Sequence, residues 1–233
     1  DEIADLIKSQ ERALKKQELD GRLATETIDI TLPTRPERTG KIHPLSQTTD
    51  ELISIFGAMG FTWQDGPEIE SEWFNYDALN IPGHHPAREA QDTFWLQDRN
   101  VLRTHTSPVQ IRTMLAQDPP IYIVAPGRVF RRDTADATHM PVFHQIEGLV
   151  IDRDITLADL AGTIDAFVTA YFGKSFPSRL RPNYFPFTEP SVEVDMLWNG
   201  EWIEVGGAGM VDPNVFTAVG YDPDEVQGFA FGL

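Results

Sequence analysis

The chain contains 233 residues with 36 acidic and 19 basic side chains, a formal net charge of −17, and no cysteine. Without cysteine, disulfides, thiolate nucleophiles and cysteine-based zinc sites are excluded, which suits a reducing cytosol. The negative charge argues against attraction of the whole surface to nucleic acid, but leaves room for a local basic site. The longest apolar runs, such as residues 121–125, are too short to cross a bilayer, and Asp1-Glu2 does not begin a signal peptide. We therefore expect a cytoplasmic chain with no membrane segment, and 41% hydrophobic residues supply material for a core.

Residues 1–19 form the first predicted element, a helix that we expect to be the end of a longer helical arm. Its apolar residues fall roughly on one stripe: Ile3, Leu6, Ile7, Ala13 and Leu14. The pattern is lost in residues 20–40, where Pro33 and Pro36 indicate an extended linker. We place the domain boundary in this linker, so that residues 41–233 form one large domain.

The domain begins with a helix predicted from Pro44 to Met59, because proline suits a helical first turn and apolar residues then recur at helical spacing. Helical composition returns at residues 106–117 and 156–173, and Thr156 is a candidate cap for the second. Extended segments are predicted at residues 61–67, 68–70, 92–96, 121–125, 128–132, 143–151, 184–188, 192–197 and 202–205. Many strands with few intervening helices favour a largely antiparallel α+β domain over a doubly wound parallel sheet.

A predicted hairpin spanning residues 126–148 is the most informative stretch. Its first strand presents Arg131, and its second offers Gln145 and Glu147 on the same face as Phe143. A guanidinium group holds a carboxylate or phosphate, a carboxylate holds an ammonium group, and an aromatic ring stacks on a flat base. Together these groups suit an amino acid and a nucleotide bound side by side. An ordinary hairpin with a surface salt bridge is the simpler alternative.

A second candidate site lies at residues 102–110, where a strand ends in polar residues and a helix begins near Thr106. Such a junction exposes unpaired backbone N–H groups and short hydroxyl side chains, which orient ligands. Helix capping explains Thr106 and Ser107 more simply, and an isolated His105 is more often structural than catalytic.

A third candidate site lies at residues 184–191. Phe185 and Phe187 are expected to share a strand face, so they either wall an apolar pocket or join the core. Glu189 needs a cation, a donor or water if its surroundings are apolar. Magnesium is one candidate partner for this carboxylate, and surface exposure is the alternative.

Two glycine-rich segments, residues 206–209 and 228–232, match neither a phosphate loop nor a dinucleotide-binding fingerprint. Turns and tight packing are the commoner reasons for such glycines. The pairs His84-His85 and His139/His144 give no convincing zinc-ligand set, so we predict no zinc site.

Taken together, these segments closely resemble the catalytic module in the family of bacterial phenylalanyl-tRNA synthetase α subunits, which are class II aminoacyl-tRNA synthetases. The resemblance covers about residues 40–233 in collinear order. It is carried by His43-Pro-Leu-Ser46, Asn75-Tyr-Asp-Ala-Leu-Asn80, His85-Pro-Ala-Arg88, Asp92-Thr-Phe-Trp95, Arg103-Thr-His-Thr-Ser107, Gly127-Arg-Val-Phe-Arg131, Phe143-His-Gln-Ile-Glu147, Phe185-Pro-Phe-Thr-Glu189, Gly207-Ala-Gly-Met-Val211 and Gly228-Phe-Ala-Phe-Gly232.

The resemblance implies a class II fold, an antiparallel sheet flanked by helices and preceded by a short N-terminal helix. Residues 60–80 are similar to motif 1 of the class and residues 127–150 to motif 2. By the same resemblance, Arg131 would bind the ATP α-phosphate and the amino-acid carboxylate. Phe143 would stack on adenine, and His139 would approach the ATP phosphates.

The family's amino-acid site implies two further sets of residues. Those expected near the ammonium and carboxylate groups are His105, Ser107, Gln110, Gln145 and Glu147. Those expected around the phenylalanine ring are Phe185 and Phe187, with Thr188 and Ala230 setting the depth of the pocket. Glu189 matches the family position for a Mg²⁺ ligand at the boundary with the β subunit.

The implied activity is ATP-dependent ligation of L-phenylalanine to tRNA(Phe) through a phenylalanyl-adenylate, by an (αβ)₂ heterotetramer. Arg131 and Mg²⁺ would neutralise the charge of the two anions that react. In the family, the segment at residues 228–232 opens motif 3 and is followed by an arginine that binds ATP, whereas this sequence stops at Leu233. The family also has a long coiled-coil arm that contacts tRNA, and only residues 1–19 resemble its end. We therefore expect motif 3 to be incomplete and the module to be truncated at both ends.

Two alternatives stay open. The first is a class II-like module that binds amino acids or has a regulatory role but lacks catalysis, and the absent motif 3 arginine supports it. Another ligase on the same fold, such as a synthetase-like asparagine synthetase, is disfavoured by the paired phenylalanines and by the Thr188-Glu189 segment.

Overall fold

The computed structural model describes residues 2–26, 29, 31, 40–88, 93–136 and 139–233. The chain divides into two units, Asp1–Ile42 and His43–Leu233. Within the described residues, none of the helices is both long enough and apolar enough to span a membrane. Residues 32–39 of the predicted linker, which include Pro33 and Pro36, lie outside the described part of the chain.

The described part of the first unit contains the helix α1 (Glu2–Thr25), which has no buried residue. The predicted helix end at residue 19 is wrong, because the helix includes six residues assigned to the linker, 20–25. Leu23 continues the apolar spacing from Leu19, and Gly21 within a helix costs only about 1 kcal/mol relative to alanine.

The second unit contains helices and strands in an irregular order. The helices are α2 (Pro44–Ala58), α3 (Glu72–Asn75), α4 (Ser107–Ala116), α5 (Leu157–Phe172) and α6 (Pro213–Val219), with 3₁₀ turns η1 (Asp77–Leu79), η2 (Pro86–Arg88) and η3 (Gln97–Arg99). The strands are β1 (Thr62–Trp63), β2 (Ile69–Ser71), β3 (Asn100–Leu102), β4 (Ile121–Phe130), β5 (Val142–Asp152), β6 (Ser178–Phe185), β7 (Thr188–Trp198), β8 (Glu201–Val211) and β9 (Gln227–Gly232).

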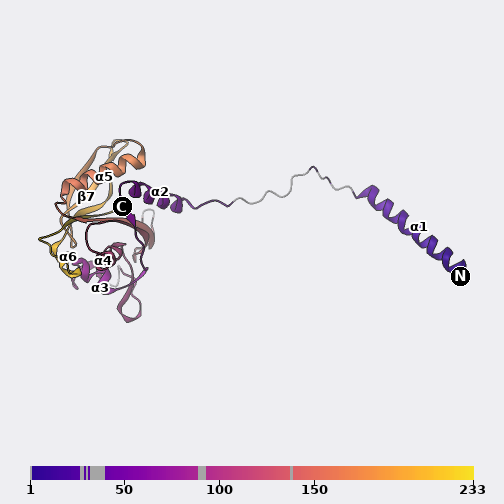
Figure 1. Cartoon of the computed structure of the whole chain (residues 1–233), viewed down its shortest axis with the longest axis horizontal. Coiled ribbons are helices and arrows are strands. Elements are labelled where there is room, and N and C mark those ends of the chain that lie inside the picture. Colours follow the sequence, from indigo (N-terminus) through magenta and orange to yellow (C-terminus); the bar gives the residue numbers. More distant parts are fainter. Residues whose placement is uncertain (1, 27–28, 30, 32–39, 89–92, 137–138) are drawn as a thin grey trace. The chain divides into compact units, whose positions relative to one another are not determined.

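Seven strands of the described chain form one sheet in the order β1-β4-β5-β9-β8-β7-β6. The β1–β4 pair is parallel and the other five pairs are antiparallel. In Figure 1, α2 and α5 lie on one side of this sheet, and α3, α4 and α6 lie on the other. The prediction of a largely antiparallel α+β domain flanked by helices is therefore confirmed.

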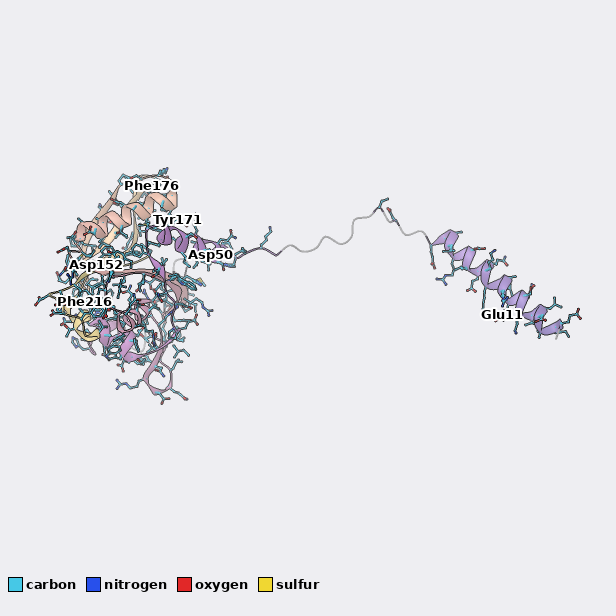
Figure 2. The ribbon with its side chains drawn as sticks, viewed as in Figure 1. Glu11, Asp50, Asp152, Tyr171, Phe176 and Phe216 are labelled. Carbon is cyan, nitrogen blue, oxygen red and sulfur yellow. The ribbon has the colours of Figure 1, made fainter. Side chains whose placement is uncertain are left out.

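Each face of the sheet has its own hydrophobic core. On the α2/α5 side, the Phe56 ring stacks on Phe167 at a centroid distance of 4.8 Å and on Phe231 at 5.4 Å. On the other side, residues of α4, α6 and η1 pack against β4 and β5. Figure 2 shows Tyr171, on the α5 side, and Phe216, on α6, at opposite sides of the sheet. Burial of one such ring contributes roughly 1.5–3 kcal/mol, so both cores fix the sheet that carries the site.

The predicted helix starts are confirmed at two places. At α5, Thr156 and Asp159 form a capping box, in which the Asp159 Oδ2 accepts the Thr156 backbone N–H at 2.8 Å. At α2, Pro44 occupies the first turn and His43 Nδ1 accepts the backbone N–H of Leu45 at 3.2 Å.

Predicted strands were wrong in three places. Residues 121–130 form one strand, not two strands separated at Pro126 as predicted. Pro126 has no N–H to donate, but it lies opposite Ile146, whose backbone N–H and C=O both bond to Leu233 and not to β4. The missing N–H therefore leaves no partner unpaired in the β4–β5 ladder. Residues 184–188 are interrupted by a turn at 186–187 between β6 and β7. In the third place, residues 93–96 make only an isolated bridge from Trp95, and Asp92 lies outside the described residues.

Candidate functional site

The β4–β5 hairpin brings the first group of predicted site residues together. Its register pairs Gly127 with Gln145 and Ala125 with Glu147. Arg131 lies just beyond the end of β4, not within a strand as predicted, and is exposed. Its guanidinium carbon lies 5.1 Å from the centre of the Phe143 ring. A cation and an aromatic face thus adjoin at the loop end of the hairpin.

Glu147 is a buried acid that binds the start of α4. Its Oε1 accepts the backbone N–H of Thr106 at 3.2 Å, and its Oε2 accepts the Ser107 hydroxyl at 2.5 Å and the Gln110 amide at 3.3 Å. The N-terminus of a helix favours an anion, because its N–H groups are unpaired. Since the Thr106 side chain makes no capping bond and Ser107 donates to Glu147, the capping interpretation of these hydroxyls is wrong.

The ionisation of Glu147 is set by competing effects. Burial raises its pKa from the ordinary value of 4.5 to about 7, while hydrogen bonds from Ser107 and Thr106 and the charges of Arg131 and Arg103 oppose the shift. A carboxyl group with a pKa near neutrality ionises readily when a cation binds beside it. Glu147 is therefore suited to receive an ammonium group.

The raised pKa of Glu147 predicts a specific pH dependence of stability. Between pH 4.5 and about 7, the folded protein holds a proton on Glu147 that the unfolded chain releases, so the free energy of unfolding falls as the pH rises. The contribution is on the order of 3 kcal/mol across this window. Urea unfolding at pH 5 and pH 8 should show a smaller decline for Glu147→Gln than for the unchanged protein. Equal declines in the two proteins would contradict a raised pKa at this residue.

His105 joins the polar and aromatic parts of the site. Burial, assisted by the positive charge of Arg131, lowers the pKa of His105 to about 3, so the ring is neutral at neutral pH. Its centroid lies 6.4 Å from that of Phe187. His105 therefore contributes a neutral polar wall, and it does not carry a proton for acid catalysis.

Two buried polar atoms beside Glu147 lack a hydrogen-bond partner among the described residues, Gln145 Oε1 and Thr106 Oγ1. A buried polar group left unpaired costs about 1–3 kcal/mol, so such atoms commonly mark a place where a ligand or water binds. Gln145 also lies against β9, because a Cβ at Gly232 would come within 3.0 Å of its Nε2. The site can therefore accept further donors next to Glu147.

The aromatic residues form a second wall. The Phe185 and Phe187 rings stack with centroids 5.8 Å apart and an interplanar angle of 9°. The prediction that they share a strand face is wrong, since Phe187 lies in the turn, yet the turn still brings the rings together. The Asn80 side-chain amide donates to the Pro186 carbonyl at 2.7 Å, which fixes that turn.

Close backbone approach shapes this aromatic wall. A Cβ at Gly207 would lie 2.7 Å from the Phe185 ring, so only glycine lets the ring lie across β8. Thr188 is buried, and its hydroxyl shares a 2.7 Å hydrogen bond with Ser191. Ala230 lies on β9 between its partners on β5 and β8. Because Thr188 and Ala230 are small, the Phe185 and Phe187 rings are the bulkiest side chains of this wall.

Two predicted ligand-binding residues lie outside this cluster. His139, on the loop between β4 and β5, is exposed, and its Nδ1 lies 3.0 Å from both carboxylate oxygens of Asp136. Glu189 is exposed at the start of β7. Among the described residues, no group of three or more His, Cys, Asp or Glu side chains is arranged to hold a metal ion.

Arg103 is a structural residue of the site that the sequence did not single out. It is 2% exposed, and its Nε donates to the Arg128 carbonyl at 2.8 Å while its Nη1 donates to the Gly66 carbonyl at 3.1 Å. A Cβ at Gly127 would lie 2.0 Å from its Nη2, so that glycine makes room for the guanidinium. In the sequence, the only signal for this contact is Gly127 within the predicted hairpin, and a glycine by itself does not show which side chain packs against it.

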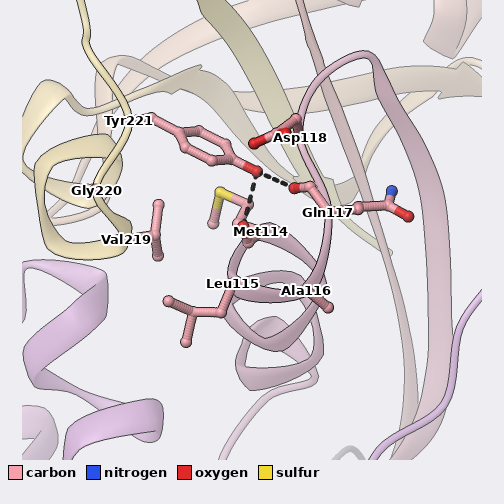
Figure 3. A pocket seen from close by; sticks show the side chains of 8 residues that line it. All are labelled: Met114, Leu115, Ala116, Gln117, Asp118, Val219, Gly220 and Tyr221. Atoms are coloured by element: carbon pink, nitrogen blue, oxygen red, sulfur yellow. Dashed lines mark hydrogen bonds between the residues drawn. The ribbon is translucent and has the colours of Figure 1, made fainter.

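A shallow pocket of about 260 Å³ lies elsewhere, between the C-terminal end of α4 and the end of α6 (Figure 3). The Tyr221 side chain lines the pocket, and its hydroxyl donates hydrogen bonds to the Met114 carbonyl at 2.7 Å and to the Gln117 carbonyl at 2.5 Å. None of the predicted site residues lines this pocket. It belongs to the packing of α4 and not to the cluster around Glu147.

Comparisons with known proteins agree with this geometry. Residues 27–233 match the family model described as tRNA synthetases class II core domain (F). A solved pyrrolysyl-tRNA synthetase from Desulfitobacterium hafniense superposes with a TM-score of 0.64 over 97% of this chain and 74% of that chain. At 18% sequence identity, this likeness supports the fold alone.

Two curated relatives are much closer in sequence. A phenylalanine–tRNA ligase α subunit from Synechocystis sp. is 54% identical over 97% of this chain and 69% of its own length. Another, from Pectobacterium atrosepticum, is 52% identical over 100% of this chain and 71% of its own length.

Proposed function

This chain belongs to the class II tRNA synthetase core family, among the phenylalanine–tRNA ligase α subunits, and on that premise we propose that it activates L-phenylalanine with ATP and transfers it to tRNA(Phe). The observation that carries the proposal is the buried Glu147 at the start of α4, with Arg131 and Phe143 at the loop end of the β4–β5 hairpin. An anion for an ammonium group thus adjoins a cation and a ring for a nucleotide.

In the proposed site, Glu147 and Gln145 hold the amino-acid ammonium, and Ser107 and Gln110 orient the Glu147 carboxylate. His105 is the neutral neighbour of this polar group. Arg131 binds both the amino-acid carboxylate and the ATP α-phosphate, and Phe143 stacks on adenine. His139, which pairs with Asp136 in the structure, is proposed to contact the ATP phosphates in place of that carboxylate.

The reaction joins two anions. A carboxylate oxygen of phenylalanine forms a bond to the α-phosphorus of ATP, the bond to the bridging oxygen breaks, and pyrophosphate leaves. Arg131 lowers the barrier because its positive charge faces the charge that develops on the phosphorus oxygens. A ribose hydroxyl of the tRNA terminus then attacks the acyl carbon, loses its proton, and AMP leaves.

The ring of the substrate is proposed to contact Phe185 and Phe187, with Thr188 and Ala230 at the end of the pocket. Aromatic pairs of this kind contribute about 0.5–1.5 kcal/mol beyond their buried area. A tyrosine hydroxyl is rejected if it finds neither space nor a partner beside Ala230, because an unpaired buried hydroxyl is costly.

Glu189 is proposed as a ligand of Mg²⁺. Magnesium is commonly held by one or two carboxylates together with the phosphates of its nucleotide, so a single exposed carboxylate fits as a shared ligand. When bound, the ion neutralises phosphate charge. The remaining proposals are a β subunit as partner in an (αβ)₂ heterotetramer and a cytoplasmic location.

The proposal is tested by ATP–pyrophosphate exchange with the full-length α subunit assembled with its partner subunit. We expect exchange that depends on phenylalanine. Exchange supported equally by unrelated amino acids would contradict the proposal, and its complete absence would favour a non-catalytic module. Calorimetric titration with phenylalanine, asparagine and aspartate separates the proposed ligase from an asparagine-forming one.

A further inference from the structure

Asn75, the last residue of α3, lies outside the set of residues that we propose to contact substrates. It is 0% exposed. Its Nδ2 donates to the Thr104 hydroxyl at 3.1 Å, and its Oδ1 accepts the Thr104 backbone N–H at 3.3 Å. Both ends of one buried amide therefore hold the same residue, which fixes the position and the orientation of Thr104.

Thr104 links this amide to the proposed site. It lies between β3 and α4 and is 8% exposed. Its carbonyl oxygen accepts the Nε–H of Arg131 at 3.1 Å, so one guanidinium donor is fixed by a peptide group that Asn75 holds. Arg131 is otherwise exposed and follows the end of a strand, where a long side chain has many rotamers.

We infer that Asn75 is a positioning residue for Arg131, whose guanidinium it orients through the Thr104 peptide group. The inference rests on the proposed function, in which Arg131 contacts both reacting anions. A shift of about 1 Å in a group that faces the transition state can lower the rate as much as 100-fold. Loss of the amide should therefore reduce turnover even though Asn75 touches no substrate.

The test compares matched variants in the assembled full-length enzyme. Thr104→Val removes the hydroxyl that Asn75 binds and keeps the Thr104 carbonyl, whereas Thr104→Ser keeps both. We expect Asn75→Leu and Thr104→Val to lower kcat for ATP–pyrophosphate exchange about 10- to 30-fold, and Thr104→Ser to stay within about 3-fold. Thr113→Val is the structural control, because it removes a buried hydroxyl that donates to the Val109 carbonyl at 2.9 Å within α4 and bonds to neither Asn75 nor Thr104.

A double-mutant cycle with Arg131→Ala separates positioning from general destabilisation. If Asn75 acts through Arg131, Asn75→Leu should change kcat by less than about 2-fold once Arg131 is alanine. Equal losses in both backgrounds, or equal losses for Thr113→Val and Thr104→Val, would overturn the inference while leaving the proposed function intact. An Arg131→Ala enzyme with unchanged phenylalanine-dependent exchange would overturn the inference and the proposed role of Arg131, whereas exchange that does not depend on phenylalanine is what would overturn the proposed activity. If Asn75→Leu fails to fold, the Thr104 pair in the same cycle decides the question.

Discussion

Replacing Arg131 with alanine is expected to lower kcat for phenylalanine-dependent ATP–pyrophosphate exchange by about 100- to 1000-fold, the range for loss of one charge-stabilising group at a reacting centre. The physical reason is that both reacting groups are anions and that Arg131, exposed beside Phe143, is the cation proposed to face them. The effect should fall mainly on kcat, because the charge on the phosphorus oxygens is largest in the transition state. Steady-state exchange kinetics with varied ATP and phenylalanine measure it.

Arg132→Ala is the matched control for this prediction. Arg132 is the next residue, is also exposed and carries the same charge, so loss of general attraction for ATP would affect both variants alike. We expect kcat for Arg132→Ala to stay within about 3-fold of the unchanged enzyme, as is usual for a surface substitution. Similar losses in the two variants would show that Arg131 has no specific role.

Much of the fold could be predicted from periodicity and turn residues. The helix after Thr156 carries both an apolar stripe and a capping box, two local signals that agree. β6 was harder, because Arg179, Arg181 and Pro182 give it a polar and interrupted pattern. These residues suit a strand at the edge of a sheet, which pairs on one side only.

The candidate site was predictable where its residues alternate along one strand. Phe143, Gln145 and Glu147 occur two residues apart on β5, so strand geometry alone places them on one face. The resemblance then suggested Ser107 and Gln110, and the structure shows both donating to Glu147.

The supporting contacts were not predictable in this way. Asn75 and Thr104 are 29 residues apart, and the bonds between them depend on how α3 packs against the start of α4. No periodic pattern encodes a contact between two irregular segments, since it arises only when tertiary packing brings them together. The turn that brings Phe187 next to Phe185 likewise depends on Asn80, which precedes it by more than 100 residues.

The second large effect is expected at the aromatic wall. Phe187→Ala should raise the KM for phenylalanine about 100-fold, which corresponds to about 2.7 kcal/mol, slightly less than the roughly 3–5 kcal/mol that deleting a phenylalanine ring from a packed core costs. The ring meets the substrate equally in the ground state and in the transition state, so kcat should change by less than about 3-fold. The KM for ATP should also stay nearly constant, since Phe187 lies beside Phe185 and His105 and not beside Phe143.

Tyr184→Ala provides the comparison for Phe187. Tyr184 adjoins Phe185 in β6 but is 69% exposed, so its ring should contribute nothing to the proposed phenylalanine pocket. The KM of the Tyr184→Ala enzyme for phenylalanine should therefore match that of the unchanged enzyme. Together with Arg131→Ala, Phe187→Ala tests whether one end of the site acts on turnover and the other on binding. A rise of KM for ATP equal to that for phenylalanine would mean that Phe187→Ala disturbs the whole site. An unchanged KM for phenylalanine would place the substrate ring elsewhere, because a ring in contact with Phe187 must lose buried area when that side chain is removed.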